Sequence, residues 1–306
     1  MLKLFLIIIL VVIVILYLIA RFFYKFAIKS GPKPYLGDFD AFAKQTVNRP
    51  CYEWFEPLLG QNTWLLESYD GLTLFAETIP LNAPTRKIAI LCHGYVNSSY
   101  SMAFQARFFH QRGYHVVMPD ARGHGKSEGE YIGFGWDDRL DMTRWIQRVL
   151  IEYGKDCEIV LFGISMGAAT VMMTAGTSLP QQVKAIIQDC GYTSVYDELK
   201  FQLKQMFKLP AFPILSVTSL YTKYKAGYSF KEASALGQVK NATCPILMIH
   251  GDADKFVPFW MLDKLYDAAP EPKRKLVVEG AVHGMAYNKD PQLYEDTLDD
   301  FLETYL

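Results

Sequence analysis

Gly163-x-Ser165-x-Gly167 is the stretch of this sequence whose residue types and spacing are best suited to chemistry. Glycines on both sides of a serine allow a sharp, strained turn, because they lack the Cβ atoms that would clash there. The pattern is that of a nucleophile elbow, in which the serine Oγ stands clear of a strand end, at the N-terminus of a helix. The free N–H of Met166 would then be a first donor to an oxyanion. The motif also arises by chance in loops, so the strand before it and the helix after it are needed to identify a nucleophile elbow.

A serine hydroxyl near neutral pH needs a general base, and that base needs an acid to orient it. Of the six histidines, His283 follows the last predicted strand, at the sheet edge where the serine also lies. We therefore predict His283 as the base; the alternative is an ordinary surface-loop histidine. Asp252 and Asp254 both follow the preceding strand. We favour Asp254 as the acid, because Asp252 directly follows Gly251 and is placed to shape a turn.

A second oxyanion donor is predicted in the loop His93-Gly94-Tyr95, which ends an early strand at the same edge. The backbone N–H of Tyr95 would act beside that of Met166; the alternative is a plain strand-end turn. The glycine-rich segment 120–129 lacks the phosphate-binding Gly-Lys-Ser/Thr pattern, so we expect it to pack against the oxyanion loop. Chemistry of this kind needs no metal and no organic cofactor, and we expect none.

The elements that must position these residues alternate between strand and helix patterns. Segments 64–68 and 72–78 flank Asp70-Gly71, a strong hairpin signal. Further strands are predicted at 87–92, 115–119, 159–162, 183–188, 245–250 and 275–278. Helices are predicted at 102–111, 136–153, from the elbow to about 175, 259–268 and 290–306, with a short one at 39–44. A hairpin followed by β-α alternation predicts an α/β fold with a doubly wound, mostly parallel sheet.

An unbroken apolar run from Leu4 to Ala20 begins the sequence. At ~1.5 Å per residue it nearly spans the ~30 Å hydrocarbon core of a bilayer, which predicts a transmembrane helix. The competing interpretation is a cleaved signal peptide, but the run is too long, and basic and aromatic residues follow where a cleavage site should be. Basic residues after the run favour a cytoplasmic C-terminal domain. We expect an anchor at 1–24, a linker and N-terminal extension at 25–62, and a catalytic domain at 63–306.

Composition narrows the classes of function. A formal net charge of −1 and the lack of a basic aromatic patch speak against nucleic-acid binding. The five cysteines are widely spaced and form no C-x-x-C pair. Four of them lie in or beside predicted core strands, and we expect these four to be buried thiols: Cys92, Cys157, Cys190 and Cys244.

Segment 192–241 interrupts the strand–helix rhythm between two core strands. It is helical in pattern and rich in aromatic residues, which are Tyr196, Phe201, Phe207, Phe212, Tyr221, Tyr224, Tyr228 and Phe230. A long insertion of this kind is either a cap over the active site or a surface for a partner.

Taken in order, these motifs resemble the α/β-hydrolases of the serine-hydrolase type, over residues 64–306 without the insertion. The arrangement is most similar to membrane-anchored Bem46-like and bacterial esterase-like members. The resemblance implies esterase, lipase, thioesterase or peptidase chemistry at Ser165, Asp254 and His283. The aromatic insertion and the anchor favour a small-molecule or lipid-like ester with an apolar acyl group, cleaved through an acyl-enzyme. The alternatives are a serine peptidase or amidase of the same fold, and a catalytically silent membrane scaffold.

Overall fold

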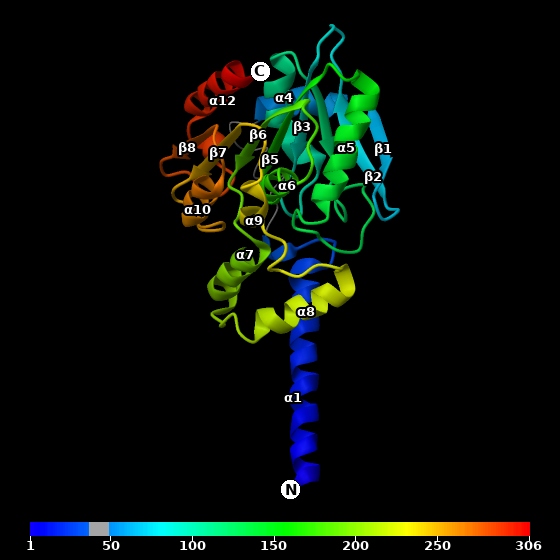
Figure 1. The fold of residues 1–306 in the computed structure, drawn as a ribbon, viewed down its shortest axis with the longest axis vertical. Helices are drawn as coiled ribbons and strands as arrows, with labels where there is room; N and C mark the ends of the chain where they lie inside the picture. Colours follow the sequence, from blue (N-terminus) through cyan, green and yellow to red (C-terminus); the bar gives the residue numbers. More distant parts are fainter. Residues whose placement is uncertain (37–48) are drawn as a thin grey trace.

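The computed structural model describes residues 1–36 and 49–306; the short helix expected at 39–44 lies outside the described residues. One eight-stranded sheet has the order β1-β2-β4-β3-β5-β6-β7-β8. Its strands are β1 (Thr63–Glu67), β2 (Thr73–Ile79), β3 (Lys87–Cys92), β4 (His115–Pro119), β5 (Glu158–Ile164), β6 (Val183–Asp189), β7 (Ile246–Gly251) and β8 (Lys273–Val278). Among these described strands, β2 pairs antiparallel with β1 and β4, and the other neighbours pair parallel. The predicted α/β fold with a mostly parallel sheet is therefore confirmed (Figure 1).

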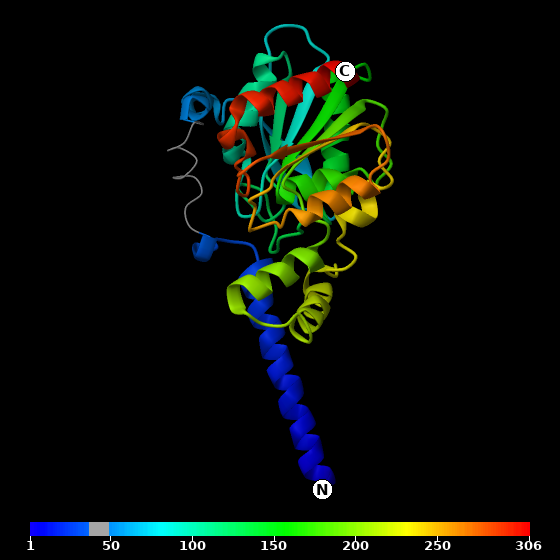
Figure 2. The same ribbon diagram turned by 90° about the vertical axis from the view of Figure 1, so that its left-hand side faces the viewer.

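Helices cover both faces of this sheet (Figures 1 and 2). The helices of the described residues are α1 (Leu2–Phe23), α3 (Arg49–Phe55), α4 (Ala103–Gln111), α5 (Asp138–Tyr153), α6 (Met166–Thr174), α7 (Val195–Gln202), α8 (Ile214–Ala226), α9 (Ala235–Val239), α10 (Trp260–Ala268), α11 (Ala286–Lys289) and α12 (Pro291–Tyr305). Single turns are η1 (Tyr24–Ile28), η2 (Pro34–Leu36), η3 (Glu56–Leu58), η4 (Ser99–Met102) and η5 (Leu203–Phe207). Every strand and helix predicted within the described residues of the sheet domain begins and ends within two residues of its observed bounds.

The central strands are apolar throughout because both of their faces are buried. In β5, Ile159 and Leu161 face a core shared with α5, α6, α9 and α10. Val160 and Phe162 face the opposite core, shared with α3, α4 and α12. This sandwich fixes the carboxyl end of β5 at the centre of the molecule, where the strand order reverses and ligand sites form in such sheets.

Segment 192–241 leaves the sheet after β6 and divides into two parts. Helices α7 and α8, joined by η5, lie off the carboxyl edge of the sheet, between the sheet and the free length of α1 (Figure 1). The remaining helix, α9, packs against α6 in the helical layer on the sheet. The part that stands over the sheet edge is thus α7–α8, which we call the cap; α9 is a crossover helix.

Helix α1 projects from the body of the molecule as a long stalk (Figure 2). The stretch Leu2–Ile28 is long and apolar enough to cross a membrane. Its last turns do not lead into a free linker, however. Ala20 and Ile28 are buried, α1 packs along α8, and the Ile28 carbonyl accepts a 2.7 Å hydrogen bond from the Ile132 N–H. The described residues just after position 24 are therefore packed on the domain.

Candidate active site

The strand–turn–helix at Ser165 has the strained geometry that its sequence predicts. Ser165 follows β5 and precedes the first residue of α6, with φ 54° and ψ −111°, a region that non-glycine residues rarely adopt. A Cβ on Gly163 would lie 2.2 Å from the Gly167 carbonyl oxygen, and one on Gly167 would lie 2.0 Å from the Cys92 carbonyl oxygen. Both glycines are needed because the backbones of the turn and of β3 approach so closely.

Ser165, His283 and Asp254 form one hydrogen-bonded chain. The Nε2 atom of His283 lies 2.9 Å from the Ser165 Oγ, and its Nδ1 lies 2.7 Å from the Asp254 Oδ2. His283 is on the loop after β8 and Asp254 on the loop after β7, so two neighbouring strand ends deliver them to the serine. With a proton on Nδ1, His283 donates to Asp254 and presents a free Nε2 lone pair to the serine hydroxyl.

Asp254 is buried and accepts hydrogen bonds on both carboxylate oxygens. Oδ1 accepts from the backbone N–H groups of Phe256 (2.8 Å) and Val257 (2.9 Å), and Oδ2 lies 3.2 Å from the His250 Nε2. Burial alone would raise the pKa of Asp254, but hydrogen bonds from His250 and His283 hold this pKa well below its usual range. The carboxylate therefore stays ionised while it orients His283.

Asp252, the alternative acid, is exposed and lies outside this chain. Its Oδ1 accepts a 2.6 Å hydrogen bond from the Gly280 N–H, which ties the loop after β7 to the loop after β8. That is the turn-shaping contact expected from its place after Gly251.

The loop at Tyr95 runs beside the serine. A Cβ on Gly94 would lie 3.6 Å from the Ser165 Cβ, and Val96 has a strained φ of 62°. In the part of the chain that the structure describes, the Tyr95 N–H donates to no protein acceptor. The Met166 N–H is the first of α6 and has no partner within its helix. Two N–H donors are thus available next to Ser165.

His93 fixes this loop. Its Nδ1–H donates to the Gly94 carbonyl (2.8 Å), and its Nε2 accepts the Ala121 N–H (2.9 Å). Burial lowers the pKa of His93, so the ring is neutral, as two opposite hydrogen bonds require. Asp120 accepts the Ser99 N–H at 2.7 Å. The expected packing of segment 120–129 against the oxyanion loop is confirmed.

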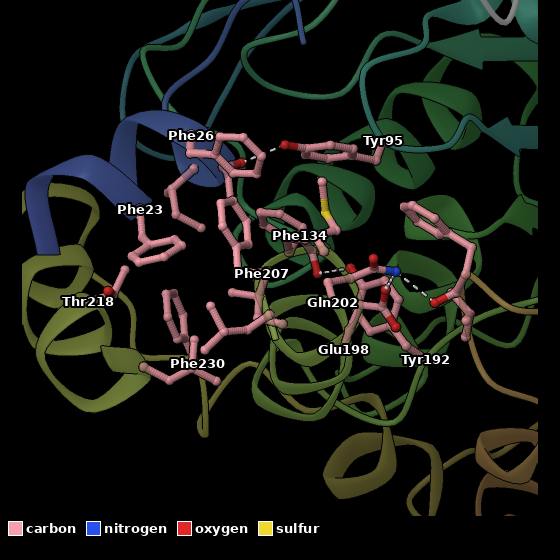
Figure 3. Close-up of a pocket in the computed structure, with 18 of the residues that line it drawn as sticks. Phe23, Phe26, Tyr95, Phe134, Tyr192, Glu198, Gln202, Phe207, Thr218 and Phe230 are labelled. Carbon is pink, nitrogen blue, oxygen red and sulfur yellow. Dashed lines mark hydrogen bonds between the residues drawn. The ribbon is translucent and has the colours of Figure 1, made fainter. Parts of the chain in front are cut away.

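Two cavities meet at Ser165. One is apolar, and Figure 3 shows aromatic rings converging on it from α1, η1, the cap and the sheet loops; they include Phe23, Phe26, Tyr95, Phe134, Phe207 and Phe230. The other carries polar side chains from the loop after β3, from α4, from the end of β6 and from α11; they include Asn97, Gln105, Asp189 and Tyr287. The serine therefore lies between an apolar and a polar compartment.

Sequence reasoning missed the buried carboxyl group of Glu198, on cap helix α7. Glu198 is only 4% exposed, and its Oε1 accepts a 2.8 Å hydrogen bond from the Gln202 amide, which also donates to the Phe256 carbonyl. Both side chains lie at the apolar cavity (Figure 3). Burial raises the pKa of Glu198 to about 8, so the group is protonated at neutral pH. A lone Glu in a helical pattern predicts a solvent-facing side chain. The loop at Phe256, which helps to bury Glu198, is distant in sequence, so no local signal marks the contact.

The residues around Ser165 are poorly suited to bind a metal ion. Among the described residues, Cys190, Asp254 and His283 bring three possible ligand atoms within 4.8 Å of one another. Burial raises the pKa of the Cys190 thiol well above its usual range, so it is protonated, and Asp254 and His283 are already paired. All five cysteines are free and buried, which confirms the expectation for Cys92, Cys157, Cys190 and Cys244.

The chain is similar in sequence to one family model and to several known proteins. The family model described as serine aminopeptidase, S33 matches residues 83–219, which include the loop at Tyr95 and the turn at Ser165. Uncharacterized protein YqkD of Bacillus subtilis is 27% identical over 268 residues, covering 87% of each chain. Lysophosphatidylserine lipase ABHD12 of Danio rerio is 29% identical over 165 residues, 53% of this chain and 41% of that protein.

Solved structures agree on the fold. The esterase Pf2001 of Pyrococcus furiosus is similar with a TM-score of 0.65 at 20% identity, covering 80% of this chain and 91% of that one. The sheet order, the succession of motifs and these likenesses together show that the chain has the α/β-hydrolase fold.

Proposed function

We propose that this α/β-hydrolase is a membrane-anchored serine hydrolase that cleaves carboxylic esters with an apolar acyl group. The observation that carries the proposal is the Ser165–His283–Asp254 hydrogen-bonded chain, whose Ser165 lines an apolar cavity. Relatives and neighbours whose names say esterase or lipase are consistent with it.

The chemistry is set by the atoms in place. Ser165 Oγ attacks the ester carbonyl carbon while its proton passes to the His283 Nε2. The negative charge that develops on the carbonyl oxygen is stabilised by the N–H groups of Tyr95 and Met166. Collapse expels the alcohol, which takes the proton from His283, and leaves the acyl-enzyme. Water, deprotonated by His283, then releases the acid and restores Ser165.

The two compartments at Ser165 suit an ester with one apolar and one polar part. The apolar cavity suits an acyl chain, since each buried methylene contributes roughly 0.8 kcal/mol. The cavity with Asn97, Gln105 and Asp189 suits the alcohol part of the ester. A peptidase or amidase of the same fold is the second candidate, because the matching family model is described as a serine aminopeptidase. A silent scaffold would not need the strained serine.

The anchor belongs to the same proposal. Retention of Leu2–Ile28 is supported by the packing of Ile28 and by cavity-lining residues at its end, which removal of a signal peptide would take away. Four basic residues on the C-terminal side of the apolar run support a cytoplasmic catalytic domain. Protease accessibility in sealed vesicles reports this orientation.

Fluorophosphonate labelling tests the nucleophile. The full-length protein should be labelled covalently at Ser165, and Ser165→Ala should lose the label while its thermal unfolding is nearly unchanged, because only one Oγ is removed. Ser101→Ala, on the polar compartment, is the matched serine control and should still be labelled. Labelling that survives in Ser165→Ala would reject the assignment. Assays of matched ester and amide substrates then separate the two candidates.

A further inference from the structure

The wall of the apolar cavity is built partly by the N-terminal helix itself. Phe23, at the end of α1, and Phe26, Ala27 and Ile28, in η1, line the same cavity as Ser165. The Phe23 and Phe26 rings each lie 5.2 Å from the Phe207 ring of the cap, centroid to centroid, in edge-on contact (Figure 3). The cavity is therefore closed jointly by the cap and by the end of the apolar helix.

The same helix end is hydrogen-bonded to the oxyanion loop. The Tyr95 hydroxyl donates to the Ala27 carbonyl at 2.8 Å, and the Tyr35 hydroxyl donates to the Phe26 carbonyl at 3.1 Å. The Tyr35 and Phe26 rings stack at 4.2 Å. These contacts hold the aromatic wall in a fixed position relative to Ser165.

The cap also exposes large apolar side chains. Phe212 and Leu220 are 76% and 73% exposed, and Met206, Leu209 and Tyr224 are exposed as well. They belong to the α7–α8 region, which lies on the side of the molecule from which α1 leaves (Figures 1 and 2). If α1 crosses a bilayer, this apolar surface faces the lipid headgroups and upper acyl chains.

We propose that the end of the N-terminal helix is part of the acyl-binding site, and that it receives the chain of a lipid ester directly from the bilayer in which α1 is embedded. The proposal rests on the proposed ester hydrolase function and adds its substrate class, a membrane lipid ester. A chain that moves from bilayer to apolar cavity along this wall keeps its methylenes away from water, whereas a route through solvent would expose them. Through the hydrogen bond between the Tyr95 hydroxyl and the Ala27 carbonyl, the same helix end also holds the oxyanion loop in place.

Chain-length preference of variants tests the wall. Full-length protein in phosphatidylcholine vesicles is assayed with p-nitrophenyl butyrate and p-nitrophenyl palmitate, which share one leaving group. Phe26→Ala should lower the palmitate-to-butyrate ratio of kcat/KM about tenfold or more, the discrimination typical of lost apolar pocket contacts. Phe26→Leu should restore most of the ratio. Phe5→Ala, in the same helix but far from the cavity and exposed, should leave it unchanged. An unchanged ratio in Phe26→Ala would overturn the proposal.

A photo-crosslinking measurement does not depend on turnover. The Ser165→Ala protein in the same vesicles is irradiated with a palmitoyl ester that carries a diazirine on its chain, and the labelled peptides are sequenced. Labelling within residues 22–29 together with the cap supports the proposal, even if no ester is hydrolysed and the proposed function fails. Labelling confined to the sheet loops overturns it, while hydrolysis of both esters by the wild type would leave the proposed function standing.

Discussion

The carboxylate of Asp254 is held by neighbouring groups on both of its oxygens. Two backbone N–H groups hold one oxygen, and two histidines approach the other. This fixes the carboxylate's orientation, and through it the proton-bearing nitrogen of His283. Asp252 makes a backbone contact that closes a turn and lies outside the chain.

Replacement of the two aspartates should separate their roles. Asp254→Asn should lower kcat for ester hydrolysis by about 10⁴-fold, because an amide cannot stabilise the imidazolium and favours the wrong histidine tautomer. Asp252→Asn keeps an oxygen that can accept from Gly280 and should cost less than about tenfold. Steady-state kinetics with p-nitrophenyl butyrate measures both, and thermal unfolding controls for folding. Reversed magnitudes would assign the acid to Asp252.

Cap helix α7 carries an ionisable group whose burial couples cap stability to pH. Folded Glu198 has a pKa of about 8, against about 4.3 for an unperturbed Glu. Between these values the folded state holds a proton that the unfolded state has lost, so the free energy of unfolding falls as pH rises through this window. The contribution is fully present below the lower value and lost above the higher one.

Glu198→Gln should remove this dependence. The amide oxygen can still accept from Gln202 and cannot ionise, so we expect the variant to gain stability over the wild type at pH 8.5, on the order of 1 kcal/mol or more. At pH 5, where only the first part of this loss has occurred, the difference between the two proteins should be much smaller. Thermal unfolding at both pH values measures the difference. An equal shift at pH 5 and pH 8.5 would mean that Glu198 is not protonated in the folded protein.

Local sequence patterns were enough to predict the strands and helices. They were not enough to predict the contacts between segments that are distant in the sequence. The run before Gly163 and the last strand before His283 are apolar enough to mark the core strands, and strand ends on one edge bring the loops together. The partners of Glu198, the Ala27–Tyr95 contact and the place of Phe26 at the cavity depend on how the cap and α1 pack. No periodicity within either segment encodes that packing.

The end of α1 packs on the domain without an intervening free linker. This packing determines how many N-terminal residues can be deleted without disturbing the domain. The first half of α1 is exposed along its length, whereas Ile19 and Phe23 pack against the core that the sheet shares with α5 and α6. Ala20 and Ile28 are buried. An anchor ending at residue 24 therefore does not separate cleanly from η1 and the domain. A cut after residue 23 keeps Ser165, His283 and Asp254, but it removes Phe23 from the cavity wall.

A deletion series should reveal this boundary. Removal of residues 1–15 should release the protein from membranes and preserve both fluorophosphonate labelling and the palmitate-to-butyrate ratio, because it removes only exposed residues, all apolar except Lys3. Removal of residues 1–28 should also release it, but with the long-chain preference lost and the free energy of unfolding lowered by about 2–5 kcal/mol, the usual cost of losing one buried Ile side chain. It also removes the Ala27 carbonyl that holds Tyr95, so labelling should slow as well. Membrane fractionation, chemical denaturation and labelling rates measure the three effects. Equal behaviour of the two truncated proteins would show that α1 is a detachable anchor and nothing more.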